Sequence, residues 1–305
     1  MATLKEIRKK IKTTQSIQKT TKAMQMIAAA RFQKAQHQVI SSRPYALKIH
    51  HLLSDMLKKT AAKPLVHPFL SGGTSNREGI LVITSDKGLC GAYNTNIMKN
   101  AFEFIRSKNI TDLEIFVIGK KGRDYFKRNG LVIKHEYFDM FKNFSAVKAE
   151  IITDEIIKSF LQDKLKKFSI MHAEYKSIFY QPIAMKQLLP IENRTTDTEQ
   201  NAEQTRNSSN SVPSEVPVRF RVMFDYIYEP SGKIIVDKLF NRYLKSEVFK
   251  ILTEAYTSEV ATRQNSMENA NKNSTEIISE LSLVMNKLRQ QQITTELTEI
   301  MGASE

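Results

Sequence analysis

Apolar and small side chains near the N-terminus recur at steps of three and four residues, the spacing of one face of an α-helix. They form two sets with these steps, Leu4, Ile7 and Ile11, and then Ile17, Thr20, Met24 and Ile27. They predict one long helix over residues 3–43, and the small residues of "MIAAAR" would let a second helix approach it closely. Pro44 ends or kinks this helix, because proline has no backbone N–H to donate.

The C-terminal part of the chain also has a helical pattern. It contains no proline from Ser231 to Met301, so a helix of roughly seventy residues is allowed. Seven of its residues have the heptad spacing of a coiled coil with a partner helix, namely Met267, Ala270, Ser274, Ile277, Leu281, Val284 and Leu288. The sequence after Leu288, "RQQQITTELTEI", is too polar for an ordinary core helix and indicates a contact outside this chain.

The middle of the chain has the patterns of alternating strands and helices instead of one long helix. Short apolar or alternating runs predict strands at 79–84, 113–119, 131–138 and 168–175, with a further strand at 218–230. Helical stretches lie between them, near 94–108, 120–129 and 145–162. This order predicts an α/β fold with a mainly parallel sheet flanked by helices.

These patterns divide the chain into an N-terminal helix (1–60), a Pro/Gly linker (61–78), an α/β domain (79–230) and a C-terminal helix (231–305). Residues 193–217 are almost purely polar, so ordering them would bury nothing that offsets the lost entropy. We expect that segment to be a disordered insertion.

Composition fits a protein with long exposed helices: 41% of residues are hydrophobic and 26% are charged. One cysteine excludes an internal disulfide and favours a reducing compartment. No apolar run is long enough to span a bilayer. The first 35 residues are basic, as in a transit peptide, but their helical pattern continues unbroken, which indicates part of the mature protein.

The net charge of +14 is unevenly distributed. Residues 1–60 hold thirteen lysines and arginines against two acidic residues, a net charge of +11. Residues 246–305 hold five lysines and arginines against nine glutamates, a net charge of −4. Opposite charges favour the two ends of the chain lying side by side, and the basic excess must face solvent or an acidic partner.

The stretch "ITSDKGLCGAYN" (83–94) admits three interpretations: a nucleophilic Cys90, a phosphate-binding loop, or a strand-to-helix turn. It lacks the spacing of a P-loop and of a dinucleotide fingerprint. A nucleophilic thiol needs a histidine base, and His135 and His172 both fall in strand patterns. A buried structural Cys90 is therefore the favoured interpretation.

No other catalytic or metal-binding pattern is present in the sequence. His50 and His51 lack ligand spacing to any cysteine or carboxylate cluster, and Asp225 and Glu229 form only a commonplace pair. The residues thus predict a non-enzymatic, mechanical or scaffolding chain without cofactor or metal. A basic coiled coil that binds nucleic acid is the alternative, although the N-terminal helix lacks interleaved aromatic residues.

Four separated motifs resemble the gamma subunit of the F-type ATP synthase. They are "IQKTTKAMQMIAAARFQKAQ" (17–36) with "SRPYA" (42–46), "ITSDKGLCGAYNTN" (83–96), "DYIYEP" (225–230), and "NKLRQQQITTELTEIMGA" (286–303) preceded by "SEVATRQNSMENANKNS" (258–274). The resemblance covers the whole chain except residues 193–217.

This resemblance implies a long antiparallel coiled coil of the two termini and a Rossmann-like domain between them. In the family the coiled coil is a rotor shaft inside a ring of alternating alpha and beta subunits, one copy per complex. The globular part sits with the epsilon subunit on the membrane c-ring, and a delta subunit completes the expected partners. Proton flow turns the shaft, which drives ATP synthesis or hydrolysis on the beta subunits.

Five residues are implied to contact the beta subunits. Arg289, Gln290 and Thr294 match the shaft positions that touch the catch loops, while Met24 and Lys22 match the position that faces an acidic loop. The resemblance also implies a peripheral location at the cytoplasmic face of a bacterial plasma membrane, with neither nucleic acid nor a membrane span.

The sequence departs from the family at three motif positions. Ala92 replaces the usual second glycine of "GLCGG", so the turn must tolerate a Cβ atom there. Met285 and Leu288 stand where tyrosine and alanine are usual, which changes the packing but not the polarity of the coil.

Overall fold

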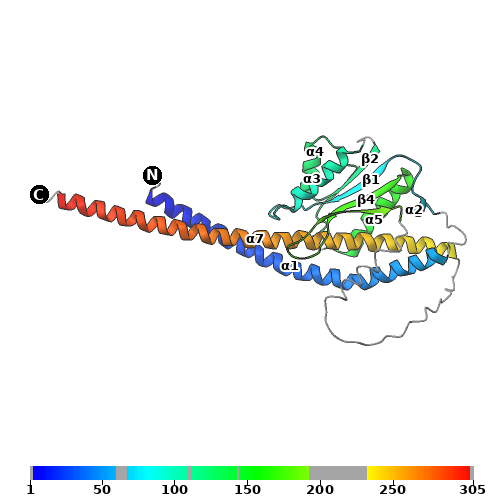
Figure 1. Cartoon of the computed structure of the whole chain (residues 1–305), viewed down its shortest axis with the longest axis horizontal. Helices are drawn as coiled ribbons and strands as arrows, with labels where there is room; N and C mark the ends of the chain where they lie inside the picture. Colours follow the sequence, from blue (N-terminus) through cyan, green and yellow to red (C-terminus); the bar gives the residue numbers. More distant parts are fainter. Residues whose placement is uncertain (1–2, 60–66, 109–111, 143, 192–231, 303–305) are drawn as a thin grey trace, which may run out of the picture.

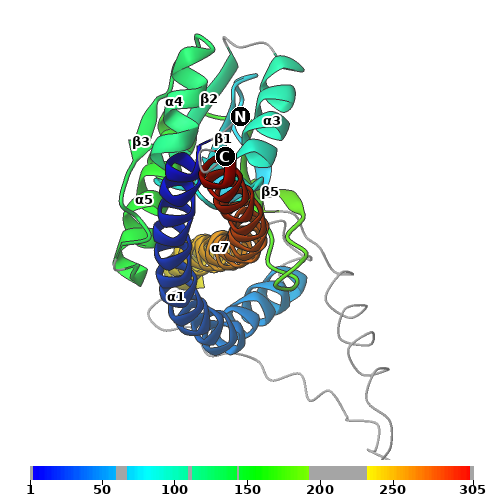
Figure 2. The same cartoon turned by 90° about the vertical axis from the view of Figure 1, so that its left-hand side faces the viewer.

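The computed structural model describes residues 3–59, 67–108, 112–142, 144–191 and 232–302. The predicted strand at 218–230 and the predicted insertion at 193–217 lie outside these residues. Two helices, α1 (Leu4–Lys59) and α7 (Gly232–Gly302), run antiparallel and side by side, as Figures 1 and 2 show. The predicted coiled coil of the two termini is therefore present.

The helix α1 does not end at the proline that interrupts its sequence. It continues through Pro44 for four more turns. Its second half, in lighter blue, runs at an angle to its first half (Figures 1 and 2). Two neighbouring serines bond back to the helix, since the hydroxyl groups of Ser41 and Ser42 donate to the carbonyl oxygens of Gln38 and Val39. Of the two outcomes predicted at Pro44, an end or a kink, the structure shows the kink: a bend within one helix.

The face of α1 that packs on α7 differs from the predicted one. Its less exposed residues follow unbroken heptad steps: Leu4, Ile7, Ile11, Thr14, Gln18, Thr21, Gln25, Ala28, Phe32, Ala35 and Val39. Leu4, Ile7 and Ile11 were predicted correctly. The next predicted positions were wrong by one residue, about 100° of rotation, and leave Ile17, Met24 and Ile27 exposed by 51%, 39% and 55%.

The partner face of α7 shows the same displacement. Met267 and Ser274 are buried, and Leu281 and Leu288 are half-buried, as the heptad predicts. Ile277 and Val284 were predicted for this face but are about half exposed (46% and 47%). The half-buried residues beside them, Ile278 and Met285, take their places.

The α/β domain is built on a five-stranded sheet with the order β3-β2-β1-β4-β5. Four strands are parallel and match predicted runs: β1 (Glu78–Ile83), β2 (Leu113–Ile118), β3 (His135–Tyr137) and β4 (Lys167–Ala173). The edge strand β5 (Ile183–Leu189) pairs antiparallel with β4 and was not predicted. In addition, β3 keeps only three of the eight residues predicted at 131–138, and a short helix α2 (Pro68–Ser71) lies in the predicted linker.

Helices cover both faces of this sheet (Figure 1). On one face, α3 (Tyr93–Arg106) and α4 (Lys120–Arg128) enclose a core of mostly aliphatic side chains with the ring of Phe126 among them. On the other face lie α5 (Ala146–Gln162) and the first half of α7. Side chains of α7 are part of this second core, and Phe240, Leu244, Val248 and Leu252 are fully buried. The same helix thus belongs both to the coiled coil and to the α/β domain.

Candidate functional site

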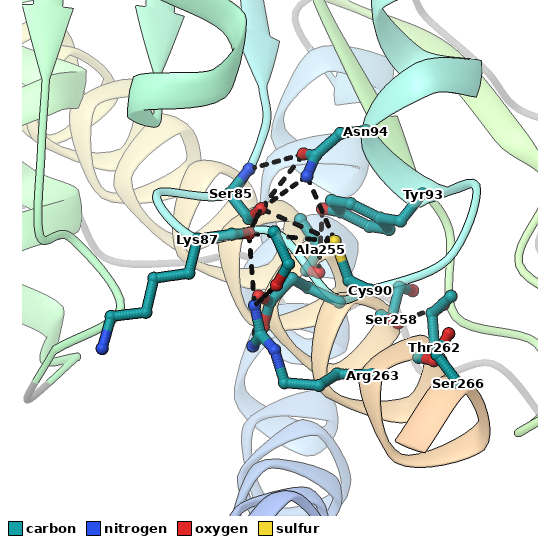
Figure 3. A network of polar contacts seen from close by, with 12 residues as sticks. Ser85, Lys87, Cys90, Tyr93, Asn94, Ala255, Ser258, Thr262, Arg263 and Ser266 are labelled. Carbon is teal, nitrogen blue, oxygen red and sulfur yellow. Dashed lines mark hydrogen bonds and ion pairs between the residues drawn. The ribbon is translucent and has the colours of Figure 1, made fainter. Parts of the chain in front are cut away.

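The "ITSDKGLCGAYN" stretch forms the turn between β1 and α3, and its side chains bond to one another (Figure 3). The Ser85 N–H donates to Asn94 Oδ1 at 3.0 Å. In return, Asn94 Nδ2 donates to Ser85 Oγ at 2.7 Å and to Cys90 Sγ at 3.1 Å. The stretch is therefore a self-bonded strand-to-helix turn, the third of the three interpretations of its sequence.

The Cys90 thiol is 1% exposed, and burial raises its pKa. Neither candidate base contacts it within the described residues. His135 stacks on Phe116 at 4.7 Å between ring centroids, and His172 Nε2 lies 3.8 Å from a carboxylate oxygen of Glu254. A thiol that is protonated and covered is a poor nucleophile, so the prediction of a buried structural cysteine is confirmed.

The N-terminus of α4 is capped by a carboxylate of the chain itself. Asp86 Oδ1 accepts the Lys120 N–H at the first residue of α4, at 3.1 Å. Asp86 Oδ2 accepts the Asp139 N–H, also at 3.1 Å. The positive end of the α4 dipole is thus already neutralised. Ala92 fits the turn without strain, since its φ of −82° suits any residue.

The β1–α3 turn also attaches the α/β domain to α7, as Figure 3 shows. Arg263 Nη2 donates to the carbonyl oxygens of Lys87 and Gly88, both at 3.4 Å, and its guanidinium pairs with Glu259, which is 4% exposed. The fully buried Tyr93 hydroxyl donates to the Ala255 carbonyl oxygen at 3.2 Å. None of these contacts between distant segments was predicted from the sequence.

A glycine lets the turn approach α7 closely. Gly91 has a φ of +56°, a left-handed conformation that glycine adopts without cost. A Cβ atom there would lie 2.7 Å from Ser266 Oγ. The turn and α7 are therefore in direct contact.

All five predicted beta-subunit contact residues lie on the exposed surface of the shaft. Arg289, Gln290 and Thr294 are exposed on α7, and Met24 and Lys22 are exposed on α1. The hydrogen bond from Gln18 Nε2 to Thr275 Oγ1 (2.8 Å) fixes the antiparallel register, which places the start of α1 level with Arg289.

The shaft does not bring the two predicted groups together. Met24 lies twenty residues after the start of α1, so it is about 30 Å along the shaft from Arg289. The two groups of predicted contact residues occupy separate levels of the shaft, and the C-terminal part of α7 continues past the N-terminal end of α1 (Figure 1).

Other sequence candidates show no chemistry among the described residues. His50 and His51 lie edge to face on α1, and no cluster of possible metal ligands includes them within the part of the chain that the structure describes. Asp225 and Glu229 lie outside that part. In the described ranges, no helix is both long and apolar enough to cross a bilayer.

The fold and the shaft define a class of protein: an antiparallel coiled coil that carries an α/β domain at one end and leaves the other end free. Comparison with known proteins narrows this class. The family model described as ATP synthase matches residues 3–305. The chain belongs to the ATP synthase gamma chain family.

Individual relatives match over the full length. The chain is 33% identical to the ATP synthase gamma chain of Geobacter sp. (strain M21), covering 100% of this chain and 99% of that one. It is also 33% identical to the gamma chain of Heliobacterium modesticaldum, with the same coverage.

Solved structures share the fold at lower identity. A chain of the Euglena gracilis mitochondrial ATP synthase has a TM-score of 0.64 and 17% identity, covering 98% of this chain and 93% of that one. A chain of the Tetrahymena thermophila mitochondrial ATP synthase, in a structure of the central stalk and c-ring, has a TM-score of 0.61 and 20% identity. It covers 82% of this chain and 99% of its counterpart.

Proposed function

We propose that this chain is the central rotor shaft of an F-type ATP synthase, and that it couples proton flow to ATP synthesis or hydrolysis on the beta subunits. The observation that carries the proposal is that α7 belongs both to the α/β domain and to the coiled coil. Its first half is built into the core of the α/β domain, and its second half forms the free end of the coiled coil. Rotation of the domain must therefore turn the shaft.

The chain itself supplies no catalytic group in this mechanism. Its role is mechanical, because each beta subunit adopts the conformation that fits the face of the shaft turned toward it. The orientation of the shaft thus shifts the populations of the beta-subunit conformations, as a ligand does when it binds one conformation better than another. The buried Cys90, which no histidine among the described residues contacts, supports a non-catalytic subunit.

The expected partners are the alpha and beta subunits around the shaft, and the epsilon and delta subunits and the c-ring elsewhere in the complex, with one copy of this chain. The exposed face of α1 supports a partner for the shaft. Ile17, Met24 and Ile27 form an apolar stripe beside basic side chains such as Lys22, a combination suited to a partner with both apolar and acidic groups. We place the complex at the cytoplasmic face of a bacterial plasma membrane, with this chain as a peripheral subunit.

The contact with the beta subunits can be tested at the free end of the shaft. In the double variant Arg289→Ala, Gln290→Ala, two exposed polar groups are lost from α7 without any change to its core. We expect the reconstituted complex to assemble normally but to hydrolyse ATP about fivefold more slowly, as the loss of roughly 1 kcal/mol of charge-assisted hydrogen bonding would produce.

The matched control is Lys287→Ala, Glu280→Ala, which removes two exposed charged groups from the same helix. Equal turnover in the double variant and the unmodified complex would overturn the assignment of Arg289 and Gln290. Co-purification tests the function as a whole, because a tagged chain should recover alpha, beta and epsilon subunits. Steeply salt-dependent DNA binding without these subunits would favour the nucleic-acid scaffold instead.

A further inference from the structure

A cleft of about 420 Å³ lies between the coiled coil and the carboxyl edge of the sheet. Four segments line it: α1, α7, the turn after β1 and the loop after β3. Its volume is within the range of small-molecule sites, and the carboxyl edge of a mainly parallel sheet is where α/β folds bind ligands. Because α1 and α7 close one side of it, this cleft is not bounded by the α/β domain alone.

Basic side chains dominate the charge of the cleft. Arg31 and Lys34 come from α1, Lys87 from the turn after β1, and Lys142 from the loop after β3. Among the described residues, none of these four charged groups forms an ion pair. Figure 3 shows the Lys87 side chain extending away from the network of Ser85 and Asn94. Four cations on three segments thus remain available to an incoming anion.

The acidic groups of the cleft are largely engaged. Both carboxylate oxygens of Asp86 accept backbone N–H groups, and Glu259 pairs with Arg263. Asp139 is the remaining carboxylate in the lining. Asp86 keeps its charge while it accepts these bonds, so the four cations face two carboxylates, Asp86 and Asp139, which still leaves a positive potential. A concave surface with low-dielectric walls concentrates this potential.

One wall of the cleft is aromatic. The rings of Phe141 and Tyr256 stack with centroids 5.1 Å apart and an interplanar angle of 18°. Phe144 lies next to them, 6.1 Å from Phe141 between centroids. Basic groups on the rim beside an aromatic wall suit a ligand that carries several negative charges and a planar group.

We infer that this cleft binds a phosphate-bearing anion, with Arg31, Lys34, Lys87 and Lys142 as the groups that contact its phosphates. A polyphosphate chain concentrates its charge more densely than a carboxylate, and lysine and arginine side chains both bind phosphate oxygens. A nucleotide or an inorganic polyphosphate would satisfy the four cations equally well. The nucleotide would in addition place its base against Phe141 and Tyr256.

The test uses the purified full chain and isothermal titration with tripolyphosphate and, separately, with ATP. The cleft variant is Lys34→Gln, Lys142→Gln. The matched control, Lys99→Gln, Lys158→Gln, removes two exposed lysines outside the cleft that have no ion-pair partner among the described residues. We expect one saturable site, at least about tenfold weaker in the cleft variant and unchanged in the control. Circular dichroism confirms that both variants are folded.

The other outcomes are decisive. No saturable binding of either probe overturns the inference, as does an equal loss of affinity in the cleft variant and the control, which would mean unspecific attraction to a basic protein. A poly-glutamate peptide of matched charge that binds as tightly as tripolyphosphate also overturns it. Tighter binding of ATP than of tripolyphosphate, abolished by Phe141→Leu, identifies a nucleotide as the source of the phosphate. Because no other subunit is present, these results are independent of the proposed rotor function.

Discussion

The contact between Gly91 and α7 allows a quantitative test of how the α/β domain is held on the shaft. In Gly91→Ala, the left-handed backbone (φ +56°) costs an L-residue about 1–2 kcal/mol. The new Cβ atom would also lie 2.7 Å from Ser266 Oγ, so this hydroxyl must move. Moving it breaks the 2.8 Å bond that it donates to the Thr262 carbonyl oxygen, which costs about 1 kcal/mol. We expect a total destabilisation of about 2–3 kcal/mol.

A second glycine provides the control for backbone strain. Gly130 also has a positive φ (+73°), but a Cβ atom there would meet nothing within 4 Å. Gly130→Ala should therefore cost only the strain, about 1–2 kcal/mol. The free energy of unfolding of the full chain, measured by urea denaturation with far-UV circular dichroism, gives both values.

The contact itself is isolated by a double-mutant cycle. Ser266→Ala removes the hydroxyl that the new Cβ atom would meet, and the remaining neighbour, Thr262 Cγ2, is at an ordinary 3.5 Å. Gly91→Ala should therefore cost about 1 kcal/mol less when Ser266 is alanine. If Gly91→Ala costs the same in both backgrounds, or no more than Gly130→Ala, the turn does not press on α7 and the reasoning fails.

Two further predictions concern buried titratable groups. Burial raises the pKa of the Cys90 thiol, so in the folded chain it should react with a disulfide reagent at neutral pH at least about tenfold more slowly than in the urea-unfolded chain. Release of the reagent's thiolate measures both rates, and equal rates would contradict the burial of Cys90. Burial opposes the charge of Glu247, but the nearby Lys186 and Lys250 outweigh burial and lower the pKa of the Glu247 carboxyl group. The contribution of this carboxylate to stability is therefore present above its unfolded pKa of about 4.5 and is lost as the pH falls through the lower folded value. Removing Lys186 raises the folded pKa and narrows this window, so urea denaturation at a series of pH values should show a smaller acid-induced loss of stability in Lys186→Gln, and identical profiles would refute the pairing.

The parallel strands were predictable because burial on both faces produces continuous apolar runs. The residues of β1 and β2 are nearly all buried, and their sequences read "EGILVI" and "LEIFVI". The edge strand β5 has one neighbour and is mostly half-buried, so its sequence "IAMKQLL" lacks such a run. A strand that pairs along one edge only, such as β5, has too weak a pattern of apolar residues to be recognised in the sequence.

The phase of the coiled coil was harder to predict, because the first half of α1 carries two stripes. The stripe that faces α7 contains Thr14, Gln18, Thr21 and Gln25, which are polar. The apolar stripe with Ile17 faces outward. Periodicity finds the apolar stripe but does not say which partner covers it. The one warning in the sequence is the step of six residues from Ile11 to Ile17, which breaks the heptad.

The burial of Cys90 could be predicted from the turn around it, because its hydrogen-bond partners Ser85, Lys87 and Asn94 are all local. The contacts that attach this turn to α7 could not. Arg263 and Lys87 are separated by 176 residues, and Tyr93 and Ala255 by 162. A single sequence contains no signal for such pairs, and the cleft is a product of the same long-range packing.

The polar stripe between α1 and α7 has a mechanical consequence. Near the α/β domain, the coil is held by Ala28, Phe32, Val260 and Ala261, which interlock as a hydrophobic core and resist sliding. Further out, around Gln18 and Thr275, the helices meet through hydrogen-bonding groups that water can satisfy equally well. Twisting one helix against the other therefore costs less in this outer section. The shaft is torsionally stiff at its base and more compliant around Gln18 and Thr275, so a load at the free end is stored first as twist of this polar section.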